Sequence, residues 1–383
     1  MPNEQMDLDN FEPVARIVVI GVGGAGNNAV NRMIDDNISN VEFYVLNTDK
    51  QALATSKAPN RVVLGEEVTS GLGAGGNPSV GKEAANQSKE TIRAIVKGAD
   101  LVFIAAGMGG GTGTGAAPVV ASVAKEEGAL TVAIVTRPFT FEGKTRIANS
   151  VTGLNDLKDA VDAIIIVSND KLLSAAGKAP IGEAFAESDR ILAQSVRTVT
   201  DLILLPAVIN LDFADVRSTL KGAGITLIGF GTGSGPNKAE EAAENAINSP
   251  LLEASISGAR KVIVSVTCGA NVSLFDSQEC VNRITESAGA NVDVMFGVSI
   301  NPQLDDTILV SVIASDFSEE YDFTSVPKFT PLRREEVGKG VDSTRQKQIA
   351  SLVEKGDIKE EEEEDIQKKI LPNFLKGILG DDQ

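Results

Sequence analysis

Three glycine-rich segments are the parts of this chain best suited to bind an anion. Residues 21–26 read Gly-Val-Gly-Gly-Ala-Gly, residues 71–76 read Gly-Leu-Gly-Ala-Gly-Gly, and residues 107–115 read Gly-Met-Gly-Gly-Gly-Thr-Gly-Thr-Gly. Glycine leaves backbone N–H groups unobstructed, so each segment can present several donors to phosphate oxygens. A flexible linker is another use of such runs, but 107–115 stands between an apolar run and an apolar helical pattern. That position favours a phosphate-binding loop.

The first glycine segment also satisfies the dinucleotide-binding pattern G-x-G-x-x-G. Gly21, Gly23 and Gly26 have the required spacing, and Asp49 follows at about the distance expected of a ribose-binding acid. An NAD-dependent dehydrogenase is therefore an open alternative. It leaves the other two segments without a role, whereas three loops at the ends of neighbouring parallel strands would converge on one crevice.

A polar cluster at residues 210–215 is the candidate source of catalytic groups. It contains Asn210, Asp212 and Asp215. Cleavage of a terminal phosphate needs an oriented water, and glycine loops contain no group to hold one. In the alternative interpretation, Asp212 caps a helix that begins near Phe213, and Asp215 adds charge to its first turn. Both interpretations stay open at the level of sequence.

Composition excludes several other kinds of site. Histidine is absent and the only cysteines are Cys268 and Cys280, which we expect to be small buried side chains. Imidazole chemistry and thiolate zinc sites are thereby removed, and no protein-bound metal is predicted. A formal charge of −18 argues against binding nucleic acid or an anionic membrane. No segment is long and apolar enough for a membrane span or signal peptide, so we expect a cytoplasmic protein.

The spacing of apolar residues indicates the elements that position these groups. Apolar runs occur at residues 16–20, 42–47, 101–106, 130–135 and 163–167. Helical patterns lie between them near residues 27–36, 80–96 and 116–127. Such alternation predicts a parallel sheet with both faces covered.

The second half of the chain has a different organisation. A helical pattern at 181–205 predicts one long helix, followed by strand-like runs at 225–230, 261–267, 292–298 and 308–314 and helical patterns at 238–248 and after 277. We expect the following division: a flexible segment at 1–13, a nucleotide-binding domain at 14–180, the helix at 181–205, a smaller α+β domain at 206–316, a disordered acidic linker at 317–369 and an apolar docking peptide at 370–383.

Three segments together resemble the FtsZ family of bacterial tubulin-like cell-division GTPases. They are GGGTGTGAAPVVA at 109–121, RPFTFEGKTR at 137–146 and NLDFADVR at 210–217, and the resemblance extends from about residue 16 to residue 317. It implies a tubulin-like α/β fold, in which a long central helix joins a Rossmann-type GTPase domain to a smaller α+β domain.

The resemblance also implies roles for individual residues. The phosphates would be surrounded by Gly23, Gly24, Asn28, Ala74, Gly75, Gly76, Gly110, Gly111, Thr112 and Gly113, with Asn28 also reaching the base. Glu142 would bond the ribose and Arg146 would lie along the phosphates, although their spacing also suits a surface ion pair. Asn169, Phe185 and Asp189 would recognise guanine; without the family, Phe185 reads as core and Asp189 as solvent-exposed.

An FtsZ-like protein would bind GTP or GDP, with Mg²⁺ held largely by phosphates and water. It would assemble head to tail with itself, and the loop of Asp212 would reach the nucleotide of the next subunit. The resemblance further implies location at the mid-cell division site and docking of membrane-tethering and regulatory division proteins through residues 370–383, without direct membrane insertion. A tubulin-like filament protein that moves plasmids or shapes cells is a second alternative, which the core motifs barely distinguish.

Overall fold

The computed structural model describes residues 15–176, 181–204 and 207–317. The expected N-terminal segment and docking peptide, and all but the first residue of the expected linker, lie outside these ranges. Within them, one ten-stranded sheet has the order β3-β2-β1-β4-β5-β6-β7-β10-β8-β9.

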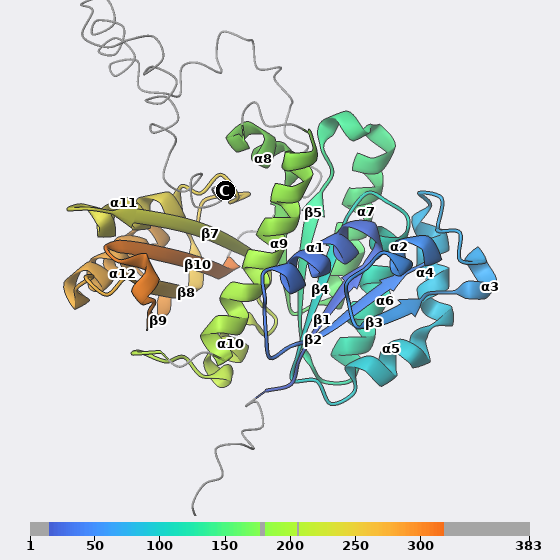
Figure 1. Ribbon diagram of the computed structural model, residues 1–383, viewed down its shortest axis with the longest axis horizontal. Coiled ribbons are helices and arrows are strands. Elements are labelled where there is room, and N and C mark those ends of the chain that lie inside the picture. The colour runs from blue at the N-terminus through green and yellow to red at the C-terminus, as the bar shows by residue number, and fades with distance from the viewer. Residues whose placement is uncertain (1–14, 177–180, 205–206, 318–383) are drawn as a thin grey trace, which may run out of the picture. The chain divides into compact units, whose positions relative to one another are not determined.

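The N-terminal part of this sheet is parallel, as the alternating pattern predicted. Its strands are β1 (Ile17–Val22), β2 (Glu42–Asn47), β3 (Asn60–Val63), β4 (Leu101–Gly107), β5 (Leu130–Arg137) and β6 (Ala163–Ser168). β1, β5 and β6 are buried along their whole length, because helices cover both faces (Figure 1). Because these strands are parallel, the glycine-rich segments that follow them all begin at the same edge of the sheet.

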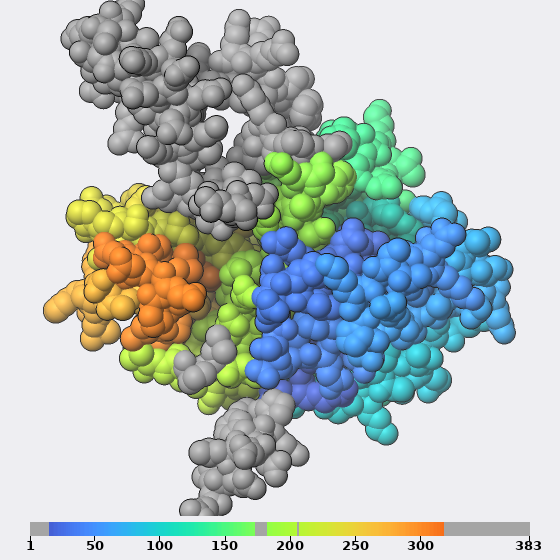
Figure 2. Space-filling view, viewed as in Figure 1, coloured from blue at the N-terminus to red at the C-terminus, as the bar shows by residue number. Residues whose placement is uncertain are grey.

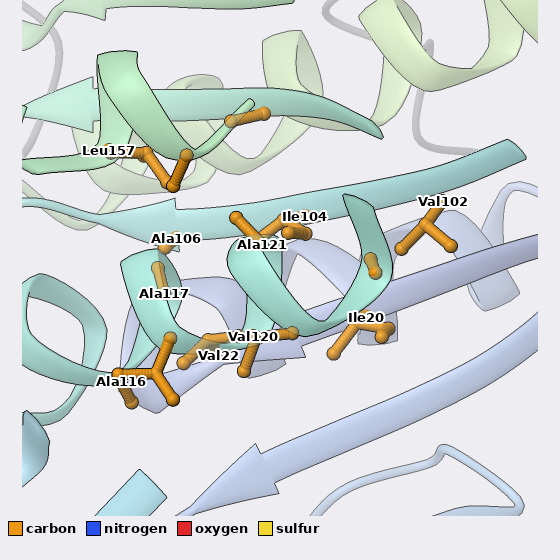
Figure 3. Close-up of a cluster of buried hydrophobic side chains, with 14 of the residues drawn as sticks. Ile20, Val22, Val102, Ile104, Ala106, Ala116, Ala117, Val120, Ala121 and Leu157 are labelled. Atoms are coloured by element: carbon orange, nitrogen blue, oxygen red, sulfur yellow. The ribbon is translucent and has the colours of Figure 1, made fainter. Parts of the chain in front are cut away.

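Two groups of helices form the covering layers. The helices of this half are α1 (Gly23–Asp35), α2 (Lys50–Ala54), α3 (Glu66–Thr69), α4 (Pro78–Gln87), α5 (Lys89–Val96), α6 (Thr112–Glu126), α7 (Lys144–Ala160) and α8 (Asn169–Ala176), with a short 3₁₀ turn η2 (Thr140–Glu142). Side chains of α4, α5, α6 and α7 pack on one face, as Figure 3 shows for α6 and Leu157 of α7 against Ile20, Val102 and Ile104. On the other face lie α1, α10 (Phe213–Leu220) and the long helix α9 (Ile181–Leu204).

The C-terminal part is a smaller α+β domain, as predicted. It contains β7 (Gly224–Ser234), α11 (Lys238–Ile247), β8 (Ala259–Cys268), α12 (Leu274–Ala288), β9 (Asp293–Ile300), η3 (Pro302–Leu304) and β10 (Thr307–Phe317). β7 continues the parallel sheet at its start, where it pairs with β6, and then pairs antiparallel with β10. Figure 2 shows this domain in yellow and orange, with green atoms between it and the blue N-terminal surface.

The helix boundaries differ from the sequence prediction where polar or glycine residues are involved. The single helix expected at 80–96 is two helices that meet at Ser88, which ends α4 and precedes α5; its hydroxyl accepts from the N–H of Gly65 at 3.0 Å. Helices α1 and α6 begin at Gly23 and Thr112, earlier than expected, so part of each glycine segment is a first helical turn. The polar helix α7, the short edge strand β3 and α8 were not predicted.

Candidate functional site

The three glycine segments meet at the carboxyl edge of the parallel strands. Thr48, just after β2, links two of the loops: its hydroxyl lies 2.6 Å from that of Thr112, and its carbonyl accepts from the N–H of Gly73 at 3.1 Å. A Cβ added to Gly111 would lie 2.8 Å from that of Ala74, which leaves room only for glycine. The predicted convergence of the loops is therefore present.

The glycines of these loops serve two different purposes. At some positions glycine is required for packing: a Cβ on Gly26 would lie 2.2 Å from the carbonyl oxygen of Ala105, and one on Gly115 would lie 1.9 Å from that of Pro78. At others, a Cβ would meet no atom of the described residues within 4 Å; these are Gly24, Gly75, Gly76 and Gly110. The open positions line a space into which backbone N–H groups can point, as a phosphate cradle requires.

Helix N-termini add to the donor set. Among the residues that the structure describes, no side chain caps the start of α1 or of α6, so their first N–H groups have no side-chain acceptor there. The partial positive charge of a helix N-terminus favours a phosphate there. Asn28, one turn beyond Gly24 on α1, is exposed on the same face. An anion held by these loops would meet two helix ends.

The segment after β5 contains the predicted ribose and phosphate contacts. Glu142 forms the expected ion pair with Arg146 and also accepts from the N–H of Phe139 at 2.9 Å. The sequence did not indicate a role for Asn149 of α7. Its amide donates to the carbonyls of Gly76 and Gly109, at 3.4 Å each, and so ties two glycine loops together.

The three residues predicted to recognise guanine lie at the first residue of α8 and in the first half of α9. Asn169 is buried and accepts from the hydroxyl of Ser188 at 3.0 Å. Phe185 is 42% exposed, so the reading of it as a core residue was wrong; its ring packs edge-on against Phe139 at 5.1 Å. An exposed aromatic face beside a buried amide suits a planar base.

Asp189 is only partly exposed, contrary to the reading that placed it in solvent. Burial raises the pKa of this carboxyl to about 7, and the positive charge of Arg32 opposes the shift. It lies one helical turn beyond Phe185 on α9. The N–H donors of guanine would stabilise its ionised form.

The acidic segment caps a helix, as one of the two interpretations of its sequence expected. Asp212 accepts from the N–H of Asp215 at 2.8 Å, and Asp215 accepts from that of Asp212 at 3.2 Å, which forms a capping box at the start of α10. In the part of the chain that the structure describes, neither carboxylate makes a hydrogen bond through its other oxygen. Both acids can thus cap the helix and still accept from water.

The acidic segment does not lie beside the glycine loops. Arg217 of α10 donates to the carbonyl of Gly128 at 3.3 Å, and Gly128 lies just before the start of β5. The contact is therefore at the amino edge of the parallel strands, whereas the glycine loops occupy the carboxyl edge. The eight residues of β5 separate the edges by roughly 26 Å. Figure 1 shows α8 and α10 at opposite ends of α9.

Other candidate residues have structural roles. Asp49 caps α2 by accepting from the N–H groups of Gln51 and Ala52. Cys268 and Cys280 are buried, as predicted, and burial raises the pKa of Cys280 to about 12. Among the described residues, no three His, Cys, Asp or Glu side chains are grouped to bind a metal. Nor does any described helix have the length and apolarity to cross a membrane.

Similarity to known families agrees with this geometry. Residues 16–177 match the GTPase domain of the Tubulin/FtsZ family, and residues 224–318 match the C-terminal domain of the FtsZ family. The chain belongs to the FtsZ family. It is accordingly a GTPase, and the dehydrogenase alternative is wrong. Two structures of M. jannaschii FtsZ, an empty dimer and a tryptophan-to-tyrosine mutant, are 39% identical to it with TM-scores of 0.77; the matches cover 81% of this chain and 90% and 93% of those chains.

More distant structures share the fold of this FtsZ-family GTPase. CetZ1 from Haloferax volcanii, a GDP-bound monomer, is 20% identical with a TM-score of 0.70, covering 79% of this chain and 95% of its own. CetZ2 from the same organism, a GTPγS-bound protofilament, is 20% identical with a TM-score of 0.67, covering 78% and 92%. The predicted tubulin-like fold is confirmed, and the individual nucleotide contacts stay predictions.

Proposed function

We propose that this GTPase assembles head to tail into filaments of the division ring and acts in cytokinesis and septum formation. The acidic segment of each subunit completes hydrolysis at the nucleotide of the next. One observation carries the proposal: the glycine loops and the acidic segment occupy opposite edges of the same sheet. A carboxylate roughly 26 Å away cannot act on its own nucleotide, but translational stacking brings the two edges together.

The nucleotide-binding residues supply binding without a base. The N–H groups around Gly24, Gly75 and Gly110 hold the phosphates, and Arg146 adds a positive charge. Asn169, Phe185 and Asp189 select guanine. Bound Mg²⁺ would spread the developing charge of the phosphates, with phosphate oxygens and water as its main ligands.

Asp212, Asp215 and Asn210 orient the attacking water from the adjacent subunit. The capping box holds both carboxylates in place before assembly, so little reorganisation is needed when the subunits meet. Exposed apolar side chains support the same contact, because Leu72 (83% exposed) lies among the glycine loops and Val208 (67% exposed) lies close to Asn210 in the chain. Burial of both in a filament would favour stacking.

The self-association of relatives supports the proposal, since an FtsZ dimer and a CetZ2 protofilament have been solved. The protein would act in the cytoplasm at mid-cell, with residues 370–383 docking membrane-tethering and regulatory division proteins. A filament protein that moves plasmids or shapes cells would have the same core, and absence of division-site localisation in living cells would favour that alternative.

A mixing experiment with Asp212→Ala tests the shared site. Alone, this variant should keep GTP affinity and lose most turnover, because it lacks the water-orienting carboxylate and keeps every predicted nucleotide contact. Added in excess to wild-type protein, it should lower the specific activity of the wild-type subunits, since their nucleotides then face altered loops. Asp293→Ala, an exposed acid of β9, is the control. Unchanged wild-type activity in the mixture would show that each subunit hydrolyses its own GTP.

A further inference from the structure

The C-terminal domain contacts the wall of the nucleotide site through residues 251–253, which lie in the connection between α11 and β8. Arg137, the last residue of β5, forms an ion pair with Glu253, with Nη1 and Oε2 3.8 Å apart. Only 8% and 3% of these two side chains are exposed. A charge pair this deeply buried links two domains that the covalent chain joins elsewhere, through α9.

Two further contacts fix the same segment. Lys171 of α8 donates to the backbone carbonyl of Leu252. Leu251 packs against a small apolar cluster formed by Val167, Leu172 and Ile191. These contacts are independent of the ion pair, since one is a side-chain to backbone bond and the other is apolar burial. Residues 251–253 are thus held at three points.

The residues on the other side of these contacts lead directly to the predicted nucleotide contacts. Arg137 immediately precedes residues 138–146, which contain Glu142 and Arg146. Thr140 donates to Asp170 through both its N–H and its hydroxyl, and Asp170 follows Asn169. The ribose side and the guanine side of the site therefore form one hydrogen-bonded wall, and residues 251–253 pack on that wall.

The Arg137–Glu253 ion pair contributes little to the stability of the fold by itself. Removing two charges from water costs several kcal/mol per ion, and a buried pair is often no better than well-packed apolar side chains. At 3.8 Å its charged atoms are also farther apart than in a direct hydrogen bond. The pair instead fixes the position of residues 251–253 relative to β5, because separating Glu253 from Arg137 would leave a buried charge.

We propose that Glu253 is a positioning residue for the nucleotide site, and that residues 251–253 couple nucleotide occupancy to the C-terminal domain. The inference rests on the proposed nucleotide contacts of Glu142, Arg146 and Asn169. Nucleotide binding orders the wall formed by residues 137–146 and 169–172, and the wall holds residues 251–253. Coupling of this kind is reciprocal, so loosening the C-terminal contact weakens nucleotide binding.

Hydrogen exchange on the wild-type protein tests the coupling without any substitution. With GDP as the probe, amides of residues 251–253 should exchange more slowly, by at least about threefold, although no predicted nucleotide contact lies there. Amides of α12, in the same domain, serve as the reference and should not change. Equal exchange of residues 251–253 with and without GDP, under conditions where calorimetry shows GDP bound, would overturn the coupling.

Paired substitutions test the positioning role. Glu253→Gln should lower both thermal stability and GDP affinity, because it leaves Arg137 charged and buried. Combining Glu253→Gln with Arg137→Met removes both charges and should restore most of the thermal stability, while GDP affinity stays about tenfold weaker than in wild type. If the ion pair had a purely structural role, the double variant should recover both thermal stability and GDP affinity. That result would refute the positioning role.

Two additional variants keep this test interpretable. Lys171→Met removes only the bond to the Leu252 carbonyl and should weaken GDP binding by a few fold without exposing a buried charge. Asp306→Asn breaks the Lys238–Asp306 ion pair within the C-terminal domain, away from residues 251–253, and should leave GDP affinity unchanged. If the wild-type protein binds no guanine nucleotide, the proposed function fails. If it binds GDP and Lys171→Met binds equally well, the coupling through residues 251–253 is refuted while the proposed function stands.

Discussion

At the scale of single residues, glycine provides two separable properties of the site. Gly26 and Gly115 allow elements to approach within a distance that any side chain would prevent. Gly24 and Gly110 face open space and affect no packing. Their sequence context is similar, and only the surrounding backbone distinguishes the two kinds. Binding and folding should therefore respond to different substitutions.

Gly24→Ala should mainly weaken nucleotide binding, whereas Gly26→Ala should mainly destabilise the fold. In Gly24→Ala the new methyl group occupies the open cradle, so GDP affinity should fall at least about tenfold while thermal stability is unchanged or slightly raised. Gly26→Ala should destabilise the fold by roughly 2–3 kcal/mol, because its Cβ meets the Ala105 carbonyl. Calorimetric titration with GDP and thermal unfolding measure both. Tight GDP binding by Gly24→Ala would argue against the cradle.

Asp189 should make the stability of the nucleotide-free protein depend on pH. Its folded-state pKa of about 7 lies above the ordinary 3.8, so the folded protein holds this proton more tightly than the unfolded chain. The contribution is fully present below pH 3.8 and is lost as pH rises to 7. Between about pH 5.5 and 7, wild type should thus lose up to roughly 1.4 kcal/mol per pH unit relative to Asp189→Asn.

The measurement is the difference in melting temperature between Asp189→Asn and wild type without nucleotide. The advantage of Asp189→Asn should grow by a few degrees up to about pH 7 and then level off. The same variant should bind GDP poorly at every pH, since its amide cannot replace a carboxylate acceptor. A melting-temperature difference that is independent of pH would mean that Asp189 titrates normally.

At the scale of elements, the capping box of α10 has a structural role and, in the proposed function, a catalytic one. α12 provides a matched comparison, because Ser273 and Asp276 form the same reciprocal arrangement at its start. Asp215→Ala and Asp276→Ala should each cost about 1 kcal/mol of stability through loss of a cap. Only Asp215→Ala should also lose most GTPase activity at saturating GTP. Equal GTPase activities in the two variants would mean that the acidic segment only caps a helix.

The central helix is the physical reason why the proposed catalytic acids cannot reach the nucleotide of their own subunit. α9 has 24 residues, or roughly 36 Å, and it separates the guanine-binding end from the start of α10. Its interior packs on the sheet along this length, through residues such as Leu192, Val196 and Val199. A rigid element of this kind keeps the acids at a fixed distance from the loops.

At the scale of the whole molecule, hydrolysis should depend on assembly. Specific GTPase activity should rise with protein concentration and reach a plateau as filaments form, because each active site of the proposed kind needs two subunits. Light scattering should increase over the same concentration range. GDP binding by the monomer should show no such dependence. Constant specific activity down to dilute monomer would contradict a site shared between subunits.

The acidic composition means that both nucleotide binding and assembly depend on contacts at short range. With a net charge of −18, the chain repels phosphate at long range, so affinity must come from N–H groups and a few cations at the site. The same charge opposes stacking, which gives exposed apolar residues such as Leu72 and Val208 added importance. Salt should therefore favour assembly by screening the repulsion between subunits.

Much of the architecture could be derived from sequence because its signals are local. Buried parallel strands are continuous apolar runs, so β1, β2 and β4 to β6 were located to within a few residues. The long α9 has an amphipathic repeat without interruption. Glycine segments that follow such strands indicated the loops, and the motifs at 109–121, 137–146 and 210–217 indicated the family.

The tertiary structure alone decided which residues lie together and how exposed they are. Local pattern could not show that Phe185 is exposed or that Asp189 is partly buried, because both depend on what packs beside α9. Nor could it indicate the bridging amide of Asn149 or the pairing of Arg137 with Glu253, 116 positions apart in the numbering of the chain. Sequence periodicity reports which face of an element is apolar; the partners of a polar side chain are set by elements distant in the chain, and only folding brings them together.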